Sequence, residues 1–167
     1  GGDLLIVAGD LTARDTHAEY LKFFHWLANK PYKKRVVIAG NHDNLAETED
    51  ILSIAKGDFE YLYDSGVQVF YDDSTPLKLD QNSLSLQDIR RAELKSLKIW
   101  GSPWTKTFEG MNPHCKAFTC DTEEELAEKW ALIPDDTDIL ITHSPPVAMF
   151  DRNAKGECCG SASLCGL

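Results

Sequence analysis

Three short apolar runs in this sequence each end at side chains that could bind a metal ion. The runs are Leu4–Ala8, Val36–Ala39 and Ile139–Thr142, and the polar residues that follow them are Asp10, then Asn41, His42 and Asp43, and finally His143. Carboxylate oxygens, amide oxygens and imidazole nitrogens are donors that divalent metals accept. In open α/β sheets, ligands bind beyond the carboxyl ends of the strands. If the three runs are strands, these side chains meet at one edge.

Taken singly, these residues have ordinary explanations. An aspartate in a turn, such as Asp10, is most often structural, and a Gly-Asn pair is typical of a turn. A lone histidine such as His143 often serves only to satisfy local hydrogen bonds. The four residues from Gly40 to Asp43, directly after an apolar run, are seldom only a turn, so the combination carries the prediction.

In order and spacing, these residues resemble the calcineurin-like metallophosphoesterase superfamily. The matching segments are Gly9-Asp10-Leu11-Thr12, Gly40-Asn41-His42-Asp43 and Thr142-His143. Gly101-Ser102-Pro103-Trp104 and His143-Ser144-Pro145-Pro146 are similar to its metallophosphoesterase-domain (MPPED-like) branch. The resemblance implies an α/β fold, in which a layered β-sandwich is flanked by helices, within a single domain over residues 1–167.

The resemblance also implies a site with two divalent metal ions (Mn, Fe, Zn or Mg). Asp10 would bridge the two metals, and Asn41 and His143 would bind the second one. His42 would bond the phosphate or protonate the leaving oxygen, and Asp43 would orient His42. A hydroxide bridging the metals would attack phosphorus, so we expect hydrolysis of a phosphodiester or a small phosphomonoester.

The superfamily has two further motifs, Asp-x-His upstream and Gly-His-x-His downstream, that this chain does not contain. The chain opens without Met directly before an expected core strand and stops after a loop. We therefore expect a fragment that lacks the first strand and the C-terminal ligand segment, so that metal binding is weakened. The alternative is an inactive family member or fragment that binds nucleotides or proteins.

The elements that must position the site alternate between strands and helices, as in α/β proteins. Beyond the three runs, we expect strands at Val67–Tyr71, Thr75–Leu79 and Leu97–Trp100. Thr16 with Glu19 and Thr122 with Glu125 have the spacing of capping boxes and predict two helix starts. A third helix is expected over residues 44–55, and long loops over residues 101–120 and from Ala148 onward.

A second group of residues could contact the substrate. Arg14 and His17 could reach a phosphate and His114 could line a pocket, although solvated charges are the simpler explanation. Trp104, Phe108 and Phe150 could stack on a base or an aryl group, and core packing is at least as good an explanation. His25 lies on the predicted first helix and is expected to be structural.

The formal net charge of −10, from 27 acidic and 17 basic residues, argues against a nucleic-acid partner or an anionic membrane surface. It leaves an anionic substrate possible, because bound metal ions can invert the local field. Apolar runs of about five residues are far shorter than the ~20 that a membrane helix needs. We expect a small phosphoester or nucleotide substrate and a cytoplasmic location; the oligomeric state stays open.

The five cysteines, all in the second half of the chain, form no CxxC pair. Reduced thiols are expected. A redox-active or weakly metal-binding cluster, a disulfide and a cysteine-based enzyme are the alternatives, the last disfavoured because no phosphate loop surrounds Cys158 and Cys159.

Overall fold

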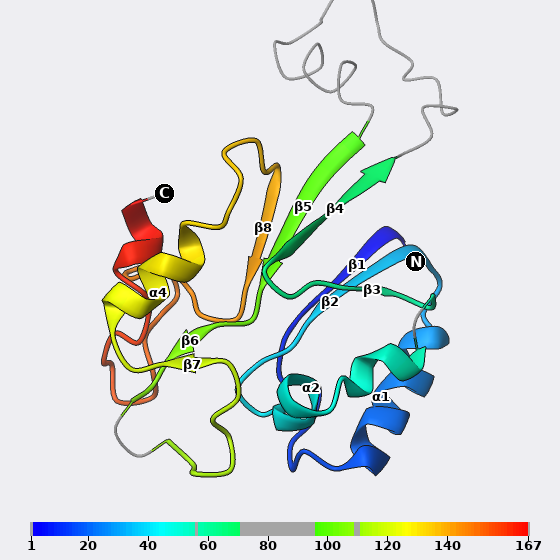
Figure 1. The fold of residues 1–167 in the computed structure, drawn as a ribbon, viewed down its shortest axis with the longest axis horizontal. Coiled ribbons are helices and arrows are strands. Elements are labelled where there is room, and N and C mark those ends of the chain that lie inside the picture. The colour runs from blue at the N-terminus through cyan, green and yellow to red at the C-terminus, as the bar shows by residue number, and fades with distance from the viewer. Residues whose placement is uncertain (1, 56, 71–95, 109–110, 167) are drawn as a thin grey trace, which may run out of the picture.

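The computed structural model describes residues 2–55, 57–70, 96–108 and 111–166, which form a layered α/β fold (Figure 1). The strands are β1 (Gly2–Ala8), β2 (Tyr32–Ile38), β3 (Glu60–Tyr61), β4 (Ser65–Phe70), β5 (Ser96–Ser102), β6 (Thr105–Lys106), β7 (Thr119–Cys120) and β8 (Ile139–Thr142). The helices are α1 (His17–Ala28), α2 (Asn44–Thr48) and α4 (Glu123–Trp130), with 3-10 turns η1 (Ile51–Ala55) and η2 (Ser163–Gly166).

The strands of these segments form two main sheets. In the first, β1, β2 and β3 run parallel in that order, and Ala8 pairs with Ile38, so β1 and β2 end side by side. In the second, β4 is antiparallel to β5, which is parallel to β8 and pairs Ser102 with Thr142. The carboxyl ends of β1, β2 and β8 are the ends that carry the predicted site residues.

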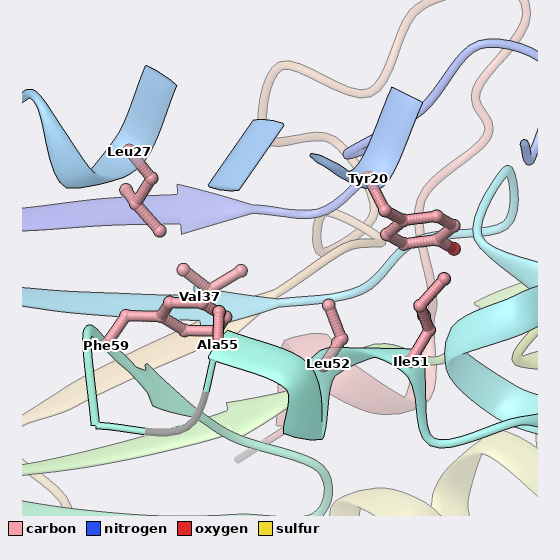
Figure 2. Close-up of a cluster of buried hydrophobic side chains, with 7 residues drawn as sticks. All are labelled: Tyr20, Leu27, Val37, Ile51, Leu52, Ala55 and Phe59. Carbon is pink, nitrogen blue, oxygen red and sulfur yellow. The ribbon is translucent and has the colours of Figure 1, made fainter. Parts of the chain in front are cut away.

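Alternation along β2 explains the layers, since successive side chains of a strand point to opposite faces. Val37 faces α1 and η1 and packs among the buried residues Tyr20, Leu27, Ile51, Leu52, Ala55 and Phe59 (Figure 2). Val36 and Ile38 face the other way and pack with Val69, Ile99 and Ile141 of the second sheet. The expected sandwich with flanking helices is therefore confirmed, with β2 buried on both faces.

Both predicted capping boxes are present. The Thr16 and Thr122 hydroxyls accept hydrogen bonds from the backbone N–H of Glu19 and Glu125, whose side chains bond back to the cap. The helix α4 buries Leu126 and Trp130 against Cys120 and Leu164.

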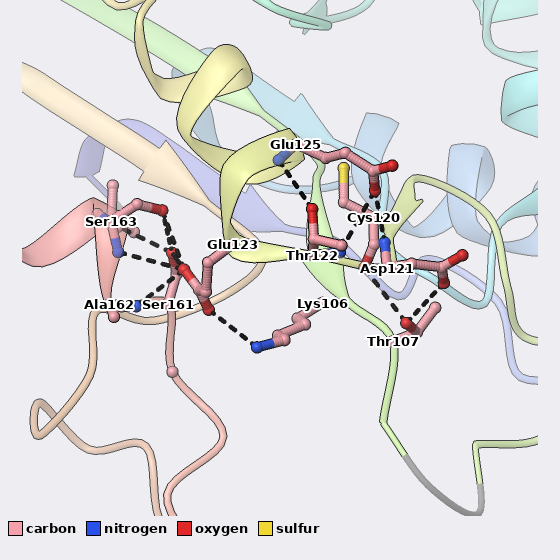
Figure 3. Close-up of polar contacts among 12 residues, drawn as sticks. Lys106, Thr107, Cys120, Asp121, Thr122, Glu123, Glu125, Ser161, Ala162 and Ser163 are labelled. Atoms are coloured by element: carbon pink, nitrogen blue, oxygen red, sulfur yellow. Dashed lines mark hydrogen bonds and ion pairs between the residues drawn. The ribbon is translucent and has the colours of Figure 1, made fainter.

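At the start of α4, the carboxylate of Glu123 accepts hydrogen bonds from the segment just before and within η2 (Figure 3). The donors are the backbone N–H groups of Ala162 and Ser163 and the hydroxyls of Ser161 and Ser163. Glu123 therefore ties the C-terminal segment to α4.

Three sequence expectations need correction. The helix predicted over residues 44–55 is two short elements, α2 and η1, because Asp50 between them adopts a left-handed conformation (φ 49°) that a helix cannot include. The expected loop over residues 101–120 contains the parallel pair β6–β7, and η2 lies in the expected C-terminal loop. The predicted strand Thr75–Leu79, and Tyr71 of the strand that became β4, lie outside the described residues.

All five cysteines lie in the described segments and none forms a disulfide; Cys115 and Cys120 are buried, and Cys158, Cys159 and Cys165 are exposed. Within residues 2–166, leaving aside the gaps, no helix is long and apolar enough to cross a membrane.

Candidate metal centre

The structure brings Asp10, Asn41 and His143 together where β1, β2 and β8 end. Nε2 of His143 lies 2.9 Å from Oδ1 of Asn41 and 3.3 Å from Oδ1 of Asp10. Two of these residues follow strands of the first sheet and the third follows a strand of the second sheet. The site therefore exists only because the two sheets pack with their carboxyl ends at the same edge.

Two glycines make this close approach possible. A Cβ on Gly9, which has a φ of 96°, would lie 2.5 Å from Nδ1 of His143. A Cβ on Gly40 would lie 2.5 Å from the backbone nitrogen of Asp10 and 2.7 Å from Cε1 of His143. All three distances are too short for a real side chain, so the Gly-Asp and Gly-Asn pairs of the sequence are required by packing across the site.

Hydrogen bonds behind the site fix which atoms face one another. Nδ1 of His143 lies 3.0 Å from the carbonyl oxygen of Ala8, which can only accept, so the hydrogen belongs on Nδ1 and Nε2 is the free ring nitrogen. Nδ2 of Asn41 donates to the carbonyl of Cys115 (3.0 Å), which sets the amide so that Oδ1 faces His143. A ring nitrogen and two oxygens thus point at one another.

This donor set fits a divalent cation. Lone pairs on three atoms converge, and only a cation between them, a metal ion or a proton on Nε2, makes that arrangement favourable. Ligands that share one ion at about 2.0–2.2 Å lie about 3 Å apart, close to the spacing seen here. In the described part of the chain no three His, Cys, Asp or Glu side chains form a metal-binding group; this set has two such residues and completes itself with the Asn41 amide.

Charge at the site also suits a cation. Burial raises the pKa of the Cys115 thiol, and the carboxylates of Asp10, Asp15 and Asp43 raise it further. The Asp10 side chain is 43% exposed and that of His143 is 16% exposed, so solvent reaches the site from the Asp10 side.

Asp43 lies behind the site rather than in it. Its side chain is fully buried, and its two oxygens accept hydrogen bonds from the N–H groups of Leu11, Thr12 and Gly40 and from the Thr12 hydroxyl, at 2.8–3.1 Å. Burial raises the pKa of Asp43, and these hydrogen bonds oppose that rise. Among the described residues the Asp43 carboxylate has no hydrogen bond to the His42 ring, and its role in orienting that ring stays a prediction.

His42 lies beside the metal ligands. Its backbone N–H donates to Oδ1 of Asp10 (3.3 Å), and its carbonyl accepts from the Thr12 hydroxyl (3.1 Å). Nδ1 of its ring lies 3.4 Å from both the Ala13 carbonyl and the Cys115 sulfur. Hydrogen bonds thus connect the backbone of His42 to the side chains of Asp10 and Thr12.

A polar cleft of about 350 Å³ is lined by Arg14, Asp15, Asn44, Pro113 and His114, and Asn44 lies two residues after His42 in the chain. Arg14 and His114 were predicted as possible substrate contacts. They both line this cleft, although they are far apart in the chain.

The remaining candidates lie elsewhere. His17 pairs with Glu49 at 3.3 Å, and His25 is exposed on α1 beside Asn29. Trp104 packs on Phe118 and donates to Asp64, which supports core packing over base stacking. Phe108 and Phe150 are exposed.

Sequence reasoning missed Cys115, which touches both Asn41 and His42. The only signal for it was the length of the aperiodic loop around it, since a long loop in a compact domain is often functional.

Comparison with known proteins identifies the family to which the chain belongs. Residues 1–165 match the model of the calcineurin-like phosphoesterases, and the chain belongs to that family. It is 37% identical over 150 residues to metallophosphoesterase domain-containing protein 1 of human and of mouse, which covers 90% of this chain and 44% of each relative. An UPF0046 protein of Caenorhabditis elegans is 31% identical over 171 residues, covering 98% of this chain and 41% of the relative. The chain spans less than half the length of these relatives.

Proposed function

We propose that the protein is a metal-dependent phosphoesterase that acts on a small phosphodiester or phosphomonoester. The observation that carries the proposal is that Oδ1 of Asn41 and Oδ1 of Asp10 both lie within 3.3 Å of Nε2 of His143, with His42 beside them. Membership of the calcineurin-like phosphoesterase family supports the reaction class.

Asp10, Asn41 and His143 would hold the metal. Divalent ions in such a site supply positive charge to the phosphate and lower the pKa of a bound water. The protein's own contribution is to keep the ligands in place: Ala8 holds the His143 ring and Cys115 holds the Asn41 amide. Such supporting contacts commonly contribute about 10–100-fold to metal affinity.

His42 would act on the ester oxygen that leaves. The Ala13 carbonyl can only accept, so Nδ1 carries a hydrogen and Nε2 is the ring nitrogen left for the substrate. To act as an acid the ring would be the imidazolium, in which Nε2 carries the second proton and passes it to the leaving oxygen. A positioned acid of this kind contributes typically ~10²–10⁴-fold to the rate.

The cleft between Arg14 and His114 would bind the rest of the substrate. Its polar lining and its volume of about 350 Å³ favour a small polar ester, such as a nucleotide, over a long apolar chain. Arg14 supplies a permanent positive charge on this side of the site.

The test is hydrolysis of bis-p-nitrophenyl phosphate with Mn²⁺ by the protein from its complete reading frame. We expect His42→Ala to lower kcat at least about 100-fold. His25→Ala, which removes a histidine from the exposed face of α1, is the matched control and should leave kcat unchanged. Equal activity of His42→Ala and wild type would refute the role of His42. An inactive wild-type protein that still binds nucleotides would support a binding role instead.

A further inference from the structure

The segment Asn112–Phe118 is bonded along the stretch that carries Asn41 and His42. Cys115 accepts from Nδ2 of Asn41 at 3.0 Å and Ala117 donates its N–H to the Asn41 carbonyl at 3.3 Å. Two more hydrogen bonds extend this contact, from Nδ2 of Asn44 to the His114 carbonyl at 2.7 Å and from the Phe118 N–H to Oε1 of Glu47 at 3.3 Å. The segment is therefore a wall of the site, held at four points.

Cys115 is the residue of this wall that reaches both functional side chains. Its carbonyl orients the Asn41 amide, and its sulfur lies 3.4 Å from Nδ1 of His42. The Ala13 carbonyl oxygen lies at the same 3.4 Å from Nδ1. Because sulfur is larger than oxygen, this distance is a close contact for sulfur and a long one for oxygen. The thiol is thus the tighter neighbour of the ring.

The burial of the sulfur fits a supporting role. Cys115 is only 5% exposed, so its side chain is enclosed beside the His42 ring. When Nδ1 carries the hydrogen the sulfur accepts weakly from it, and the sulfur fills the space on that side of the ring. Both effects hold the His42 ring in one orientation with Nε2 free.

We propose that Cys115 is a positioning residue for His42, whose thiol holds the imidazole in the orientation that serves the leaving oxygen. This assignment rests on the proposed phosphoesterase function and on the acid role of His42.

The kinetic test compares Cys115→Ala, Cys115→Ser and wild type on methyl phenyl phosphate and methyl p-nitrophenyl phosphate. Phenolate is a more basic leaving group than p-nitrophenolate, so its departure depends more on protonation by the acid. We expect Cys115→Ala to lower kcat about 2–10-fold on the phenyl ester, the range of one neutral hydrogen bond, and less on the nitrophenyl ester, with KM unchanged. Cys115→Ser, which keeps a hydrogen-bonding atom, should recover part of the loss.

Cys120→Ala is the matched control, because Cys120 is also 5% exposed and lies at the end of the same loop, packed among Leu126 and Trp130. It should leave the ratio of the two esters unchanged. An equal fall of kcat on both esters in Cys115→Ala would mean that the residue is only structural and would overturn the assignment.

A second readout does not depend on activity. Two-bond ¹H–¹⁵N spectra of the histidine rings, with His42 identified from His42→Ala, should show altered His42 signals in Cys115→Ala and unaltered ones in Cys120→Ala. Unaltered His42 signals in Cys115→Ala would overturn the proposal. If the wild type hydrolyses neither ester, the phosphoesterase function fails, while the spectra still decide whether Cys115 holds the ring.

Discussion

Substitution of Gly40 by alanine tests whether close packing of backbone and ligands builds the metal centre. The φ of Gly40 is outside the left-handed region, so alanine meets no backbone penalty there, and the effect comes from the added methyl group alone. That methyl would lie 2.5 Å from N and 2.6 Å from Oδ1 of Asp10 and 2.7 Å from Cε1 of His143.

The size of the effect follows from these distances. Ordinary Cβ contacts are 3.4–4 Å, so the neighbouring atoms must retreat by about 0.7–0.9 Å. Overpacking of this kind costs typically about 1–3 kcal/mol of folding free energy, and each kcal/mol lowers Tm by roughly 2–4 °C at this chain length. The same shift moves Asp10 away from His143, now 3.3 Å apart, beyond the reach of one shared ion.

The measurements are thermal unfolding of the metal-free protein and calorimetric titration with Mn²⁺. We expect Gly40→Ala to lower Tm by several degrees and to weaken Mn²⁺ binding at least about 10-fold. Gly166→Ala is the matched control, because a Cβ there meets no atom within 4 Å, and it should behave as wild type. If Gly40→Ala binds Mn²⁺ as tightly as wild type with an unchanged Tm, the close-packing account of the centre is wrong.

Two further predictions concern carboxylates that accept several hydrogen bonds. Asp43→Asn leaves one oxygen in place of two and should lose one or two of the hydrogen bonds from Leu11, Gly40 and Thr12. We therefore expect urea unfolding to show about 2–4 kcal/mol of destabilisation. An unchanged free energy of unfolding would contradict a stabilising role for these hydrogen bonds. Burial raises the pKa of Glu123, but hydrogen bonds from Ser163 and its neighbours outweigh burial and lower that pKa below the ordinary value. The folded pKa is therefore below the unfolded one, so the stabilisation is present above the unfolded pKa of about 4.3 and is lost as pH falls through the folded value. Wild type should lose more stability than Glu123→Gln between about pH 6 and pH 3, measured by thermal melts, and parallel curves would refute this.

The parts of the site that could be predicted are those that depend on short stretches of chain. The structure brings Asp10, Asn41 and His143 together as expected, because each follows an apolar run either directly or after a single glycine, and the end of a strand delivers the next residues to the sheet edge. The capping boxes at Thr16 and Thr122 were confirmed for the same reason, since each depends on two residues three apart.

The hydrogen bonds of Asp43 show where such reasoning stops. The family resemblance assigned Asp43 to orienting the His42 ring, which stays a prediction, while the hydrogen bonds of its carboxylate go to Gly40 and to Leu11 and Thr12, about 30 residues away. A side chain selects among all donors within reach in three dimensions, and adjacency in the chain does not decide that choice. The break of the expected helix at Asp50 was also invisible, because it depends on a single backbone dihedral.

The sequence by itself determined which residues stand at the ends of strands and where two helices begin, because those features depend on neighbours within a few positions. Only the tertiary structure decided that His143, from the second sheet, lies 2.9 Å from Asn41 of the first, and that Cys115 orients the Asn41 amide from 74 residues away. Contacts of this kind depend on how β2 packs between its two layers. That packing is set by the summed burial of many side chains, and no local pattern encodes the resulting distances.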